Sequence, residues 1–288
     1  METFQAMRDW LQQKLAELAR VGDKVTVYPG SMGIASFGPV CLDKTSEHYG
    51  NITTTPKLAW QNFPIYRLMR DAFGFGDEHP GRTGRLLMDT DVNIPALYEY
   101  NLAKAKGDPL VKESLCYITV GTGIGIGLII NGKTVHGMMH PEGGHVRVPI
   151  SPLEKSLYND FRGICPFHGD CLEGLCTNVA IKERLGLKHV DEVKALPDEH
   201  QIWDLMAYYM GTFCANLFLT MSIERISIGG GIYNRKVLMS KTREVFEQSI
   251  NKYVQMDQIS SQEKIAKFIV RPELGDGLGT MAAATIAA

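Results

Sequence analysis

The chain has 288 residues, of which 44% are hydrophobic and 22% are charged, and its formal net charge is −2 at pH 7. This composition is typical of a soluble globular protein of about two domains. No run of lysine or arginine supplies the basic footprint that nucleic-acid binding needs. No apolar stretch approaches the ~20 residues that span a bilayer. We therefore expect a cytoplasmic protein that binds neither nucleic acid nor membrane.

Helix-like and strand-like segments alternate along the chain. Apolar residues spaced three and four apart, with capping residues, predict helices at 2–20, 64–74, 94–106, 178–185, 200–222 and 235–250, and an Ala-rich helix after 279. Buried strands are predicted at 25–28, 32–40, 85–91, 114–120, 125–130, 225–228 and 266–270. An Asn131-Gly132 turn predicts a hairpin into 133–136, and residues 77–84 are expected to form a surface loop. Such βα units predict mixed α/β layers, with ligands at the carboxyl ends of strands and a domain boundary near residue 92.

Two cysteines and two histidines have the spacing of a metal site. Cys165, His168 and Cys171 lie within seven residues, and His145 lies twenty positions before the first of them. Thiolate and imidazole both suit zinc, and four such ligands close a tetrahedral structural site. We predict a Zn²⁺ ion on these four side chains, with Cys176 as the substitute if one of them is wrong. The alternative is a set of unliganded core thiols; a disulfide framework is not expected, because no signal peptide opens the chain.

Two carboxylates lie beside the predicted ligands. Glu142 precedes His145 in the segment Pro-Glu-Gly-Gly-His, and Glu173 follows Cys171. A metal that holds both segments together would also fix two acidic side chains facing one place. We therefore interpret the metal as the scaffold of a polar pocket.

Three glycine-rich segments are candidates for contact with a ligand. Residues 121–127 join two strands without the lysine of a P-loop and without opening a helix, so phosphate contact and a plain hairpin both stay open. Gly229-Gly230-Gly231 follows a strand and favours close approach of a flat or bulky ligand. Residues 275–279 precede the last helix, and they are either a simple turn or a helix N-terminus that accepts a phosphate or adenosine group.

Asp91 lies where a strand ends and a helix begins, in the segment Asp89-Thr-Asp91-Val-Asn93. A carboxylate at such a position is either a helix N-cap or a general base that reaches into a cleft. Asp89 is the competing candidate for the base. Alternation along the strand and the neighbouring Asn93 favour Asp91.

Together these segments resemble the ROK sugar kinases (repressor, open reading frame, kinase) of the actin-like/hexokinase ATPase superfamily, and most of all their bacterial-type fructokinases. The matching segments are Ser36-Phe-Gly38-Pro39-Val, Lys44-Thr-Ser46, residues 53–60, Asp91-Val-Asn93, Gly121-Thr-Gly-Ile-Gly125, residues 140–145, residues 165–174 and Ile228-Gly-Gly-Gly231. The resemblance runs from about residue 25 to the end. Its cysteine-histidine segment with flanking glutamates is highly specific, and its glycine motifs are weakly so.

The resemblance implies a two-domain, actin-like α/β fold, with an N-terminal domain at 1–92 and a C-terminal domain with a zinc-bound loop at 93–288. It implies phosphorylation of a hexose by ATP with Mg²⁺, with fructose the expected substrate and fructose 6-phosphate the product. A homodimer is also expected.

The resemblance also assigns roles to residues. Asp91 matches the catalytic base, and His145 would serve zinc and sugar through its two ring nitrogens. The implied sugar-binding residues are Gly38, Pro39, Asn93, Glu142, His145 and Glu173. The implied nucleotide-binding residues are Gly121, Thr122, Gly123, Gly230 and Gly231. Gly275 and Gly279, in the turn before the last helix, are added to them as candidates.

One departure from the family pattern concerns the N-terminal domain. Family members open with a strand that carries an Asp/Glu-x-Gly-Gly-Thr-Lys segment, which holds nucleotide phosphate and Mg²⁺, and this chain has no such segment. The domain is therefore expected to be truncated and to lack its first β-hairpin. Two hypotheses stay open: a kinase, or a sugar-binding pseudokinase that lacks the first phosphate loop. A repressor of the same family is disfavoured, because one helix before the first strand falls short of a helix-turn-helix.

Overall fold

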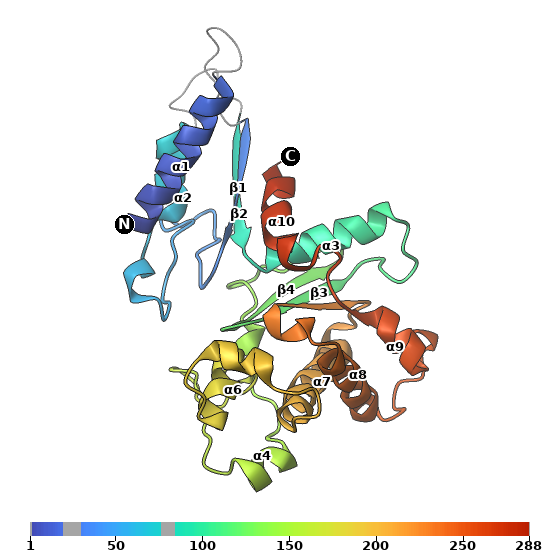
Figure 1. Ribbon diagram of the computed structural model, residues 1–288. Helices are drawn as coiled ribbons and strands as arrows, with labels where there is room; N and C mark the ends of the chain where they lie inside the picture. Colours follow the sequence, from blue (N-terminus) through green and yellow to red (C-terminus); the bar gives the residue numbers. More distant parts are fainter. Residues whose placement is uncertain (1, 20–29, 76–83, 288) are drawn as a thin grey trace. The chain divides into compact units, whose positions relative to one another are not determined.

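The computed structural model describes residues 2–19, 30–75 and 84–287 (Figure 1). Contacts divide the chain into unit 1, made of Met1–Ile94, His136–His140 and Gly279–Ala288, and unit 2, made of Pro95–Val135 and Pro141–Leu278. The domain boundary at residue 92 stays a prediction. The strand predicted at 25–28 and most of the loop predicted at 77–84 lie outside the described residues.

Unit 1 contains a two-stranded parallel sheet. β1 (Ser31–Ser36) pairs with β2 (Arg85–Thr90), and the register places the last residue of one strand opposite the last residue of the other. Parallel strands need a long crossover, and here the crossover includes α2 (Ile65–Phe73), which ends at Gly74 in the left-handed conformation. Both strands therefore present their carboxyl ends, and the residues that follow them, at the same edge of the sheet.

Helices cover the sheet of unit 1. α1 (Glu2–Ala19) buries Phe4 in the core of the unit, where the ring centroid of Phe4 lies 5.9 Å from that of Phe63. α10 (Leu278–Ala287) packs against β1 at Gly33, where an added Cβ would lie 2.2 Å from the carbonyl oxygen of Ala283. The N-terminal and C-terminal helices thus belong to one unit although they lie at opposite ends of the sequence.

Unit 2 contains a five-stranded mixed sheet in the order β5-β4-β3-β6-β7. Its strands are β3 (Leu115–Val120), β4 (Ile124–Ile130), β5 (Lys133–Thr134), β6 (Ile226–Gly229) and β7 (Ile269–Val270). β3 is antiparallel to β4 and parallel to β6. The hairpin strand predicted at 133–136 is shorter in the structure, because the chain leaves the sheet after β5 and the segment 136–140 joins unit 1.

The strand predicted at 266–270 is largely wrong. Residues Gln262–Phe268 form α9. Ser261 caps this helix, because its side chain accepts a hydrogen bond from the amide of Lys264. Only the last two residues of the predicted strand pair with β6. A short apolar run does not distinguish strand from buried helix, and here the serine cap decides for helix.

Helices cover both faces of the sheet of unit 2. α3 (Asn93–Ala105) lies on one face, and α7 (Ile202–Met221) and α8 (Lys236–Ile250) lie together on the other (Figure 1). The side chains of β6 point alternately to these two faces of the sheet. Its isoleucines belong to the hydrophobic core that contains α7, whereas the hydroxyl of Ser227 lies 3.5 Å from the carboxylate of Glu99 on α3.

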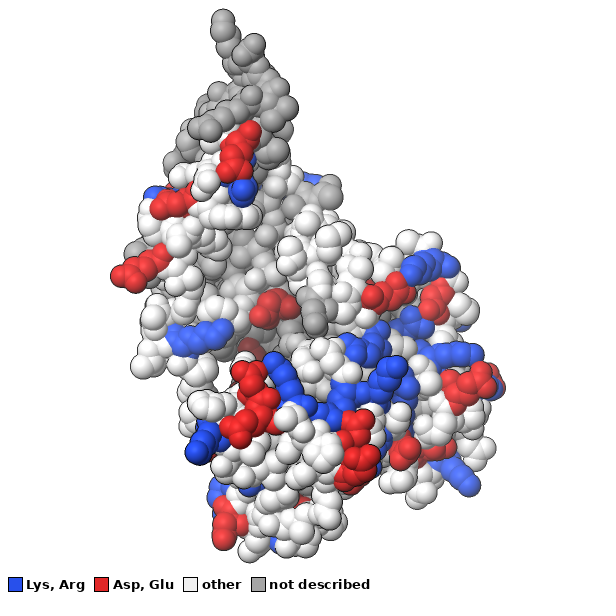
Figure 2. Space-filling model, viewed as in Figure 1, with Lys and Arg blue, Asp and Glu red and all other residues white. Residues whose placement is uncertain are grey.

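Short helices connect these layers. The α-helices are α4 (Pro152–Leu157), α5 (Leu172–Leu175) and α6 (Asn178–Leu185), of which only α6 was predicted. The 3-10 helices are Leu58–Trp60, Gly143–His145, Val190–Ala195, Gly231–Asn234, Asp257–Ile259 and Gly275–Gly277. Among the described residues, no helix is long and apolar enough to cross a membrane. Both signs of charge are interspersed on the face shown in Figure 2.

Candidate functional site

Four side chains of unit 2 form the predicted metal cluster. The ligand atoms of His145, Cys165, His168 and Cys171 all lie within 4.8 Å of one another. The Sγ atom of Cys165 lies 3.7 Å from Nδ1 of His145 and 3.6 Å from Nδ1 of His168. Ligands at the usual zinc distances, in tetrahedral geometry, are about 3.5 Å apart. Both the donor set and its spacing therefore fit one tetrahedral metal ion.

A tight backbone loop positions these ligands. The amide and carbonyl of Cys165 bond to the carbonyl and amide of Gly169, at 3.3 and 2.9 Å. Gly169 has a φ of +64°, and a Cβ added at Gly174 would lie 1.9 Å from the Gly169 carbonyl oxygen. Since larger side chains do not fit at Gly174, the glycines allow the loop to close with Cys165 and His168 on the same side.

Cys171 and Cys176 lie in different environments. Burial raises the pKa of the Cys171 thiol to about 11, so its thiolate requires a cation nearby at neutral pH. Cys176, the substitute ligand of the sequence analysis, lies outside the cluster. Its Sγ donates to the carbonyl oxygen of Met206 at 3.5 Å, in the apolar core. Cys176 is therefore a core thiol rather than a fourth ligand.

His145 and Glu173 connect the metal cluster to the first glycine turn. Nδ1 of His145 faces the cysteine sulfurs, and its Nε2 lies 4.0 Å from Oε1 of Glu173. The other oxygen of Glu173 accepts the amide hydrogen of Ile124 at 2.9 Å. A Cβ on Gly123 would lie 2.8 Å from that same oxygen. The structure thus brings together the metal ligands, Glu173 and the turn at 121–123.

The segment that carries Glu142 is fixed by a close backbone approach. A Cβ added at Gly144 would lie 2.1 Å from the carbonyl oxygen of Ile124. The carbonyl oxygen of Glu142 accepts the amide hydrogen of His145 at 3.0 Å. Glycine at 144 therefore lets the segment lie against β4, which holds Glu142 one helical turn from the metal ligand.

The other predicted nucleotide-binding glycines fall into two groups. Gly230 has a φ of +92°, and an added Cβ would lie 2.2 Å from the carbonyl oxygen of Val120, so packing alone requires glycine there. At Gly121, Gly231, Gly275 and Gly279 an added Cβ would meet no described atom within 4 Å. Open space in front of these four backbones is compatible with a ligand. Gly230 has a structural reason of its own, and so has Gly275, whose φ is +51°.

Asp91 in unit 1 lies at the carboxyl edge of the parallel sheet. Its amide donates to the carbonyl oxygen of Ser36 at 2.8 Å, which joins the ends of β1 and β2. The amide of Asn93 donates a hydrogen bond to Oγ1 of Thr90 at 2.9 Å, so Thr90 and not Asp91 makes the N-cap-type contact. Burial raises the pKa of the Asp91 carboxyl above its usual range, and the charge of Lys57 opposes this shift.

Asp89, the competing base, is engaged in a local network. Its Oδ1 accepts from Nδ2 of Asn93 at 2.9 Å, and its Oδ2 lies 2.9 Å from Nε2 of His136. The hydrogen bond to Asp89 raises the pKa of the His136 imidazole. Asn93 is 0% exposed, and its Oδ1 has no partner among the described residues. The sequence analysis missed His136, because nothing in the local sequence relates it to Asp89.

A second histidine of the same segment bonds to the residue that follows Gly38 and Pro39. Nε2 of the buried His140 accepts the amide hydrogen of Val40 at 3.1 Å. The carbonyl oxygen of Pro39 accepts the amide hydrogen of Thr53 at 2.8 Å. The sequence analysis includes His140 only in the segment 140–145, and no sequence pattern relates it to Val40.

The predicted site residues divide between the two units. Gly38, Pro39, Asp91, Asn93 and Gly279 belong to unit 1. The remaining predicted sugar-binding, nucleotide-binding and metal-binding residues belong to unit 2.

Comparisons with known proteins decide the family. A family model described as ROK family matches residues 1–288. This chain belongs to the ROK family. A putative fructokinase of Bacillus subtilis is 36% identical to this ROK protein over 261 residues, which cover 89% of the chain and 78% of the relative. A fructokinase of Zymomonas mobilis is 38% identical over 257 residues, which cover 89% of the chain and 77% of the relative.

Solved structures agree on the fold. The ROK hexokinase from Thermus thermophilus superposes with a TM-score of 0.64 at 22% identity, over 96% of this chain and 85% of that one. A ROK family glucokinase from Streptomyces griseus, solved with glucose and AMPPNP, gives a TM-score of 0.64 at 18% identity, over 98% and 86% of the two chains. The chain therefore has the actin-like fold of the ROK sugar kinases, as the sequence analysis expected.

Proposed function

We propose that this ROK protein is a fructokinase, which transfers the γ-phosphoryl group of ATP to fructose and yields fructose 6-phosphate and ADP. The broader conclusion, a phosphotransferase with a sugar acceptor, rests on the family match over the whole chain. The choice of fructose is supported by the names of the relatives at 36% and 38% identity.

Asp91 is the general base of the proposed reaction. It accepts the proton of the sugar hydroxyl as that oxygen attacks the γ-phosphorus and the bond to ADP breaks. The raised pKa of Asp91 supports this role, since a base works best with a pKa near the operating pH. The contacts of Asp89 with Asn93 and His136 support the choice of Asp91 over Asp89.

Asn93 is proposed to bind a sugar hydroxyl. Its Nδ2 donates to Asp89, which fixes the amide orientation and leaves Oδ1 as the free acceptor. A buried acceptor without a partner costs about 1–3 kcal/mol. A sugar hydroxyl supplies the missing donor, so substrate binding removes this cost.

The other proposed sugar-binding residues are Gly38, Pro39, Glu142, His145 and Glu173. His145 uses Nδ1 for the metal, which leaves Nε2, on the side of Glu173, for the substrate. The cluster is proposed to hold Zn²⁺, as a closed structural site of two thiolates and two imidazoles. Such a site fixes the loop that carries Glu173, which keeps this carboxylate beside His145.

The nucleotide is proposed to contact the glycine segments. Gly121, Thr122 and Gly123 face its phosphates, and Gly230, Gly231, Gly275 and Gly279 face its adenosine. The open space at four of these glycines supports close approach of a ligand to their backbone. Mg²⁺ accompanies ATP and neutralises phosphate charge.

A coupled assay of ADP release tests the proposed function. Purified protein with Mg-ATP is given fructose, glucose or mannose in turn. We expect fructose-dependent ADP release, with kcat/KM for fructose at least ~10-fold above the other two hexoses, a ratio that a few hydrogen bonds supply. Preference for glucose or mannose would overturn the substrate, and no hexose-dependent release would overturn the kinase assignment.

A further inference from the structure

A cavity of about 330 Å³ lies in unit 2, lined by α4, the loop after it and the metal loop. The charged and aromatic side chains of its lining are Glu154, Lys155, Phe161, Arg162 and Asp170, besides His168. Apart from the metal ligand His168, none of the proposed sugar-binding or nucleotide-binding residues lines this cavity. Its volume lies at the small end of the range for ligand pockets.

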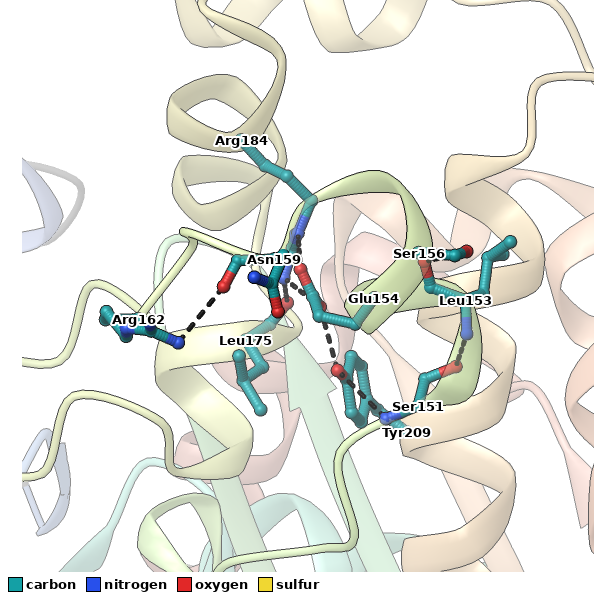
Figure 3. Close-up of polar contacts among 9 residues, drawn as sticks. All are labelled: Ser151, Leu153, Glu154, Ser156, Asn159, Arg162, Leu175, Arg184 and Tyr209. Carbon is teal, nitrogen blue, oxygen red and sulfur yellow. Dashed lines mark hydrogen bonds and ion pairs between the residues drawn. The ribbon is translucent and has the colours of Figure 1, made fainter.

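The buried carboxylate of the wall is already neutralised. Glu154 is 3% exposed, and its two oxygens accept hydrogen bonds from Nε and Nη2 of Arg184 at 2.9 and 3.0 Å (Figure 3). The hydroxyl of Tyr209 donates to the same carboxylate at 2.8 Å. Nη1 of Arg184 is buried and has no partner among the described residues. Glu154 therefore presents a satisfied ion pair to the cavity rather than an open negative charge.

The second carboxylate is also paired. Oδ1 of Asp170 accepts from Nε of Arg147 at 2.8 Å. Lys155 and Arg162 differ, since neither forms an ion pair within the described part of the chain. Nη1 of Arg162 donates only to the backbone carbonyl of Asn159, at 3.0 Å (Figure 3). The cavity is thus lined by two cationic side chains that form no ion pair with a carboxylate of the described residues.

One wall is apolar. The ring of Phe161 lies 4.1 Å from the guanidinium carbon of Arg184, which fixes the ring over the buried ion pair. A ligand that fits this combination has an anionic group for the two cations and a small body for the ring. Arginine and lysine side chains are the usual protein ligands of phosphate oxygens.

We propose that this cavity binds the phosphate group of a small phosphorylated metabolite. Lys155 and Arg162 bind the phosphate oxygens, and Phe161 packs against the remainder of the ligand. Because the cavity is lined by both α4 and the metal loop, an occupant joins these two segments. The site is separate from the proposed kinase reaction, and its existence does not depend on that reaction.

Calorimetric titration of the zinc-loaded full chain tests the proposal, with glucose 6-phosphate and inorganic phosphate as separate probes. The double variant Lys155→Ala/Arg162→Ala is compared with a matched control, Arg67→Ala/Lys188→Ala, which removes the same two charges at exposed positions elsewhere. We expect the cavity variant to weaken binding of at least one probe by ~10-fold or more, as the loss of two charge-assisted contacts implies. The control is expected to bind as the parent does.

The two probes identify the source of the phosphate. Tighter binding of glucose 6-phosphate than of inorganic phosphate supports a sugar phosphate, and equal binding supports free phosphate. Both substituted side chains are exposed, so folding is expected to be unchanged, and equal melting temperatures of the two double variants verify this. The proposal is wrong if neither probe binds the parent, or if the cavity variant binds both probes with parental affinity.

Discussion

The substitution Cys171→Ser removes one thiolate from the metal cluster and leaves the loop otherwise intact. Cys171 is fully buried, and its Sγ lies 3.6 Å from Nδ1 of His145. A structural zinc site in a small peptide contributes about 10–16 kcal/mol of binding free energy. An equal share for each of four ligands is about 2.5–4 kcal/mol, which corresponds to a ~10²–10³-fold loss of zinc affinity.

Elemental analysis and competition with a chelator measure this loss. We expect the parent to purify with about one zinc per chain, and Cys171→Ser to give up its zinc at ~10²-fold or more lower chelator concentration. Cys176→Ser is the matched control. Its thiol lies in the core beside Met206 and outside the cluster, so zinc content is expected to stay at the parental level. A parent without zinc, or a Cys171→Ser variant with parental zinc affinity, would refute the reasoning.

Two further predictions concern buried polar groups. Burial raises the pKa of Glu99 to about 7 from 4.5, so the contribution of Glu99 to the free energy of unfolding is fully present below pH 4.5 and falls by about 3 kcal/mol as the pH rises to 7. Glu99→Gln should remove this decline, which is measured as urea midpoints from pH 5 to 8. An unchanged decline would exclude Glu99 as its cause. In the Asp89–Asn93 network, His136→Ala should raise KM for fructose ~10-fold while changing kcat less, as expected for a lost hydrogen bond to a charged group. His48→Ala, at an exposed histidine, is the control, and an equal effect of both substitutions would contradict a role of His136 in positioning Asn93.

The sequence predicted best what depends on neighbours along the chain. Three of the four metal ligands lie in one short loop, so their spacing alone indicated the cluster that the structure contains. Most helices and strands also followed from periodicity. α4 and α5 were missed because six and four residues are too few to show a helical period. The ion pair of Glu154 and Arg184 joins separate helices, so no local sequence pattern predicts it.

Contacts between segments far apart in the sequence could not be predicted either, because no local sequence pattern indicates them. The hairpin strand was predicted to run to His136, yet His136 and His140 contact Asp89 and Val40 in unit 1. Gly230 was interpreted through a ligand, whereas the carbonyl of Val120 alone excludes a side chain there. The domain boundary and the homodimer stay predictions.

Direct measurement of fructose 6-phosphate formation by the parent and by Asp91→Asn tests the central claim. The parent with Mg-ATP is expected to form the product, and Asp91→Asn to lower kcat by ~10²-fold or more, as the loss of a general base implies. Fructose affinity, measured by titration, is expected to stay within a few-fold of the parent, and the exposed Asp71→Asn is expected to react as the parent does. Absence of any hexose phosphate from the parent, or turnover by Asp91→Asn within a few-fold of it, would contradict the account.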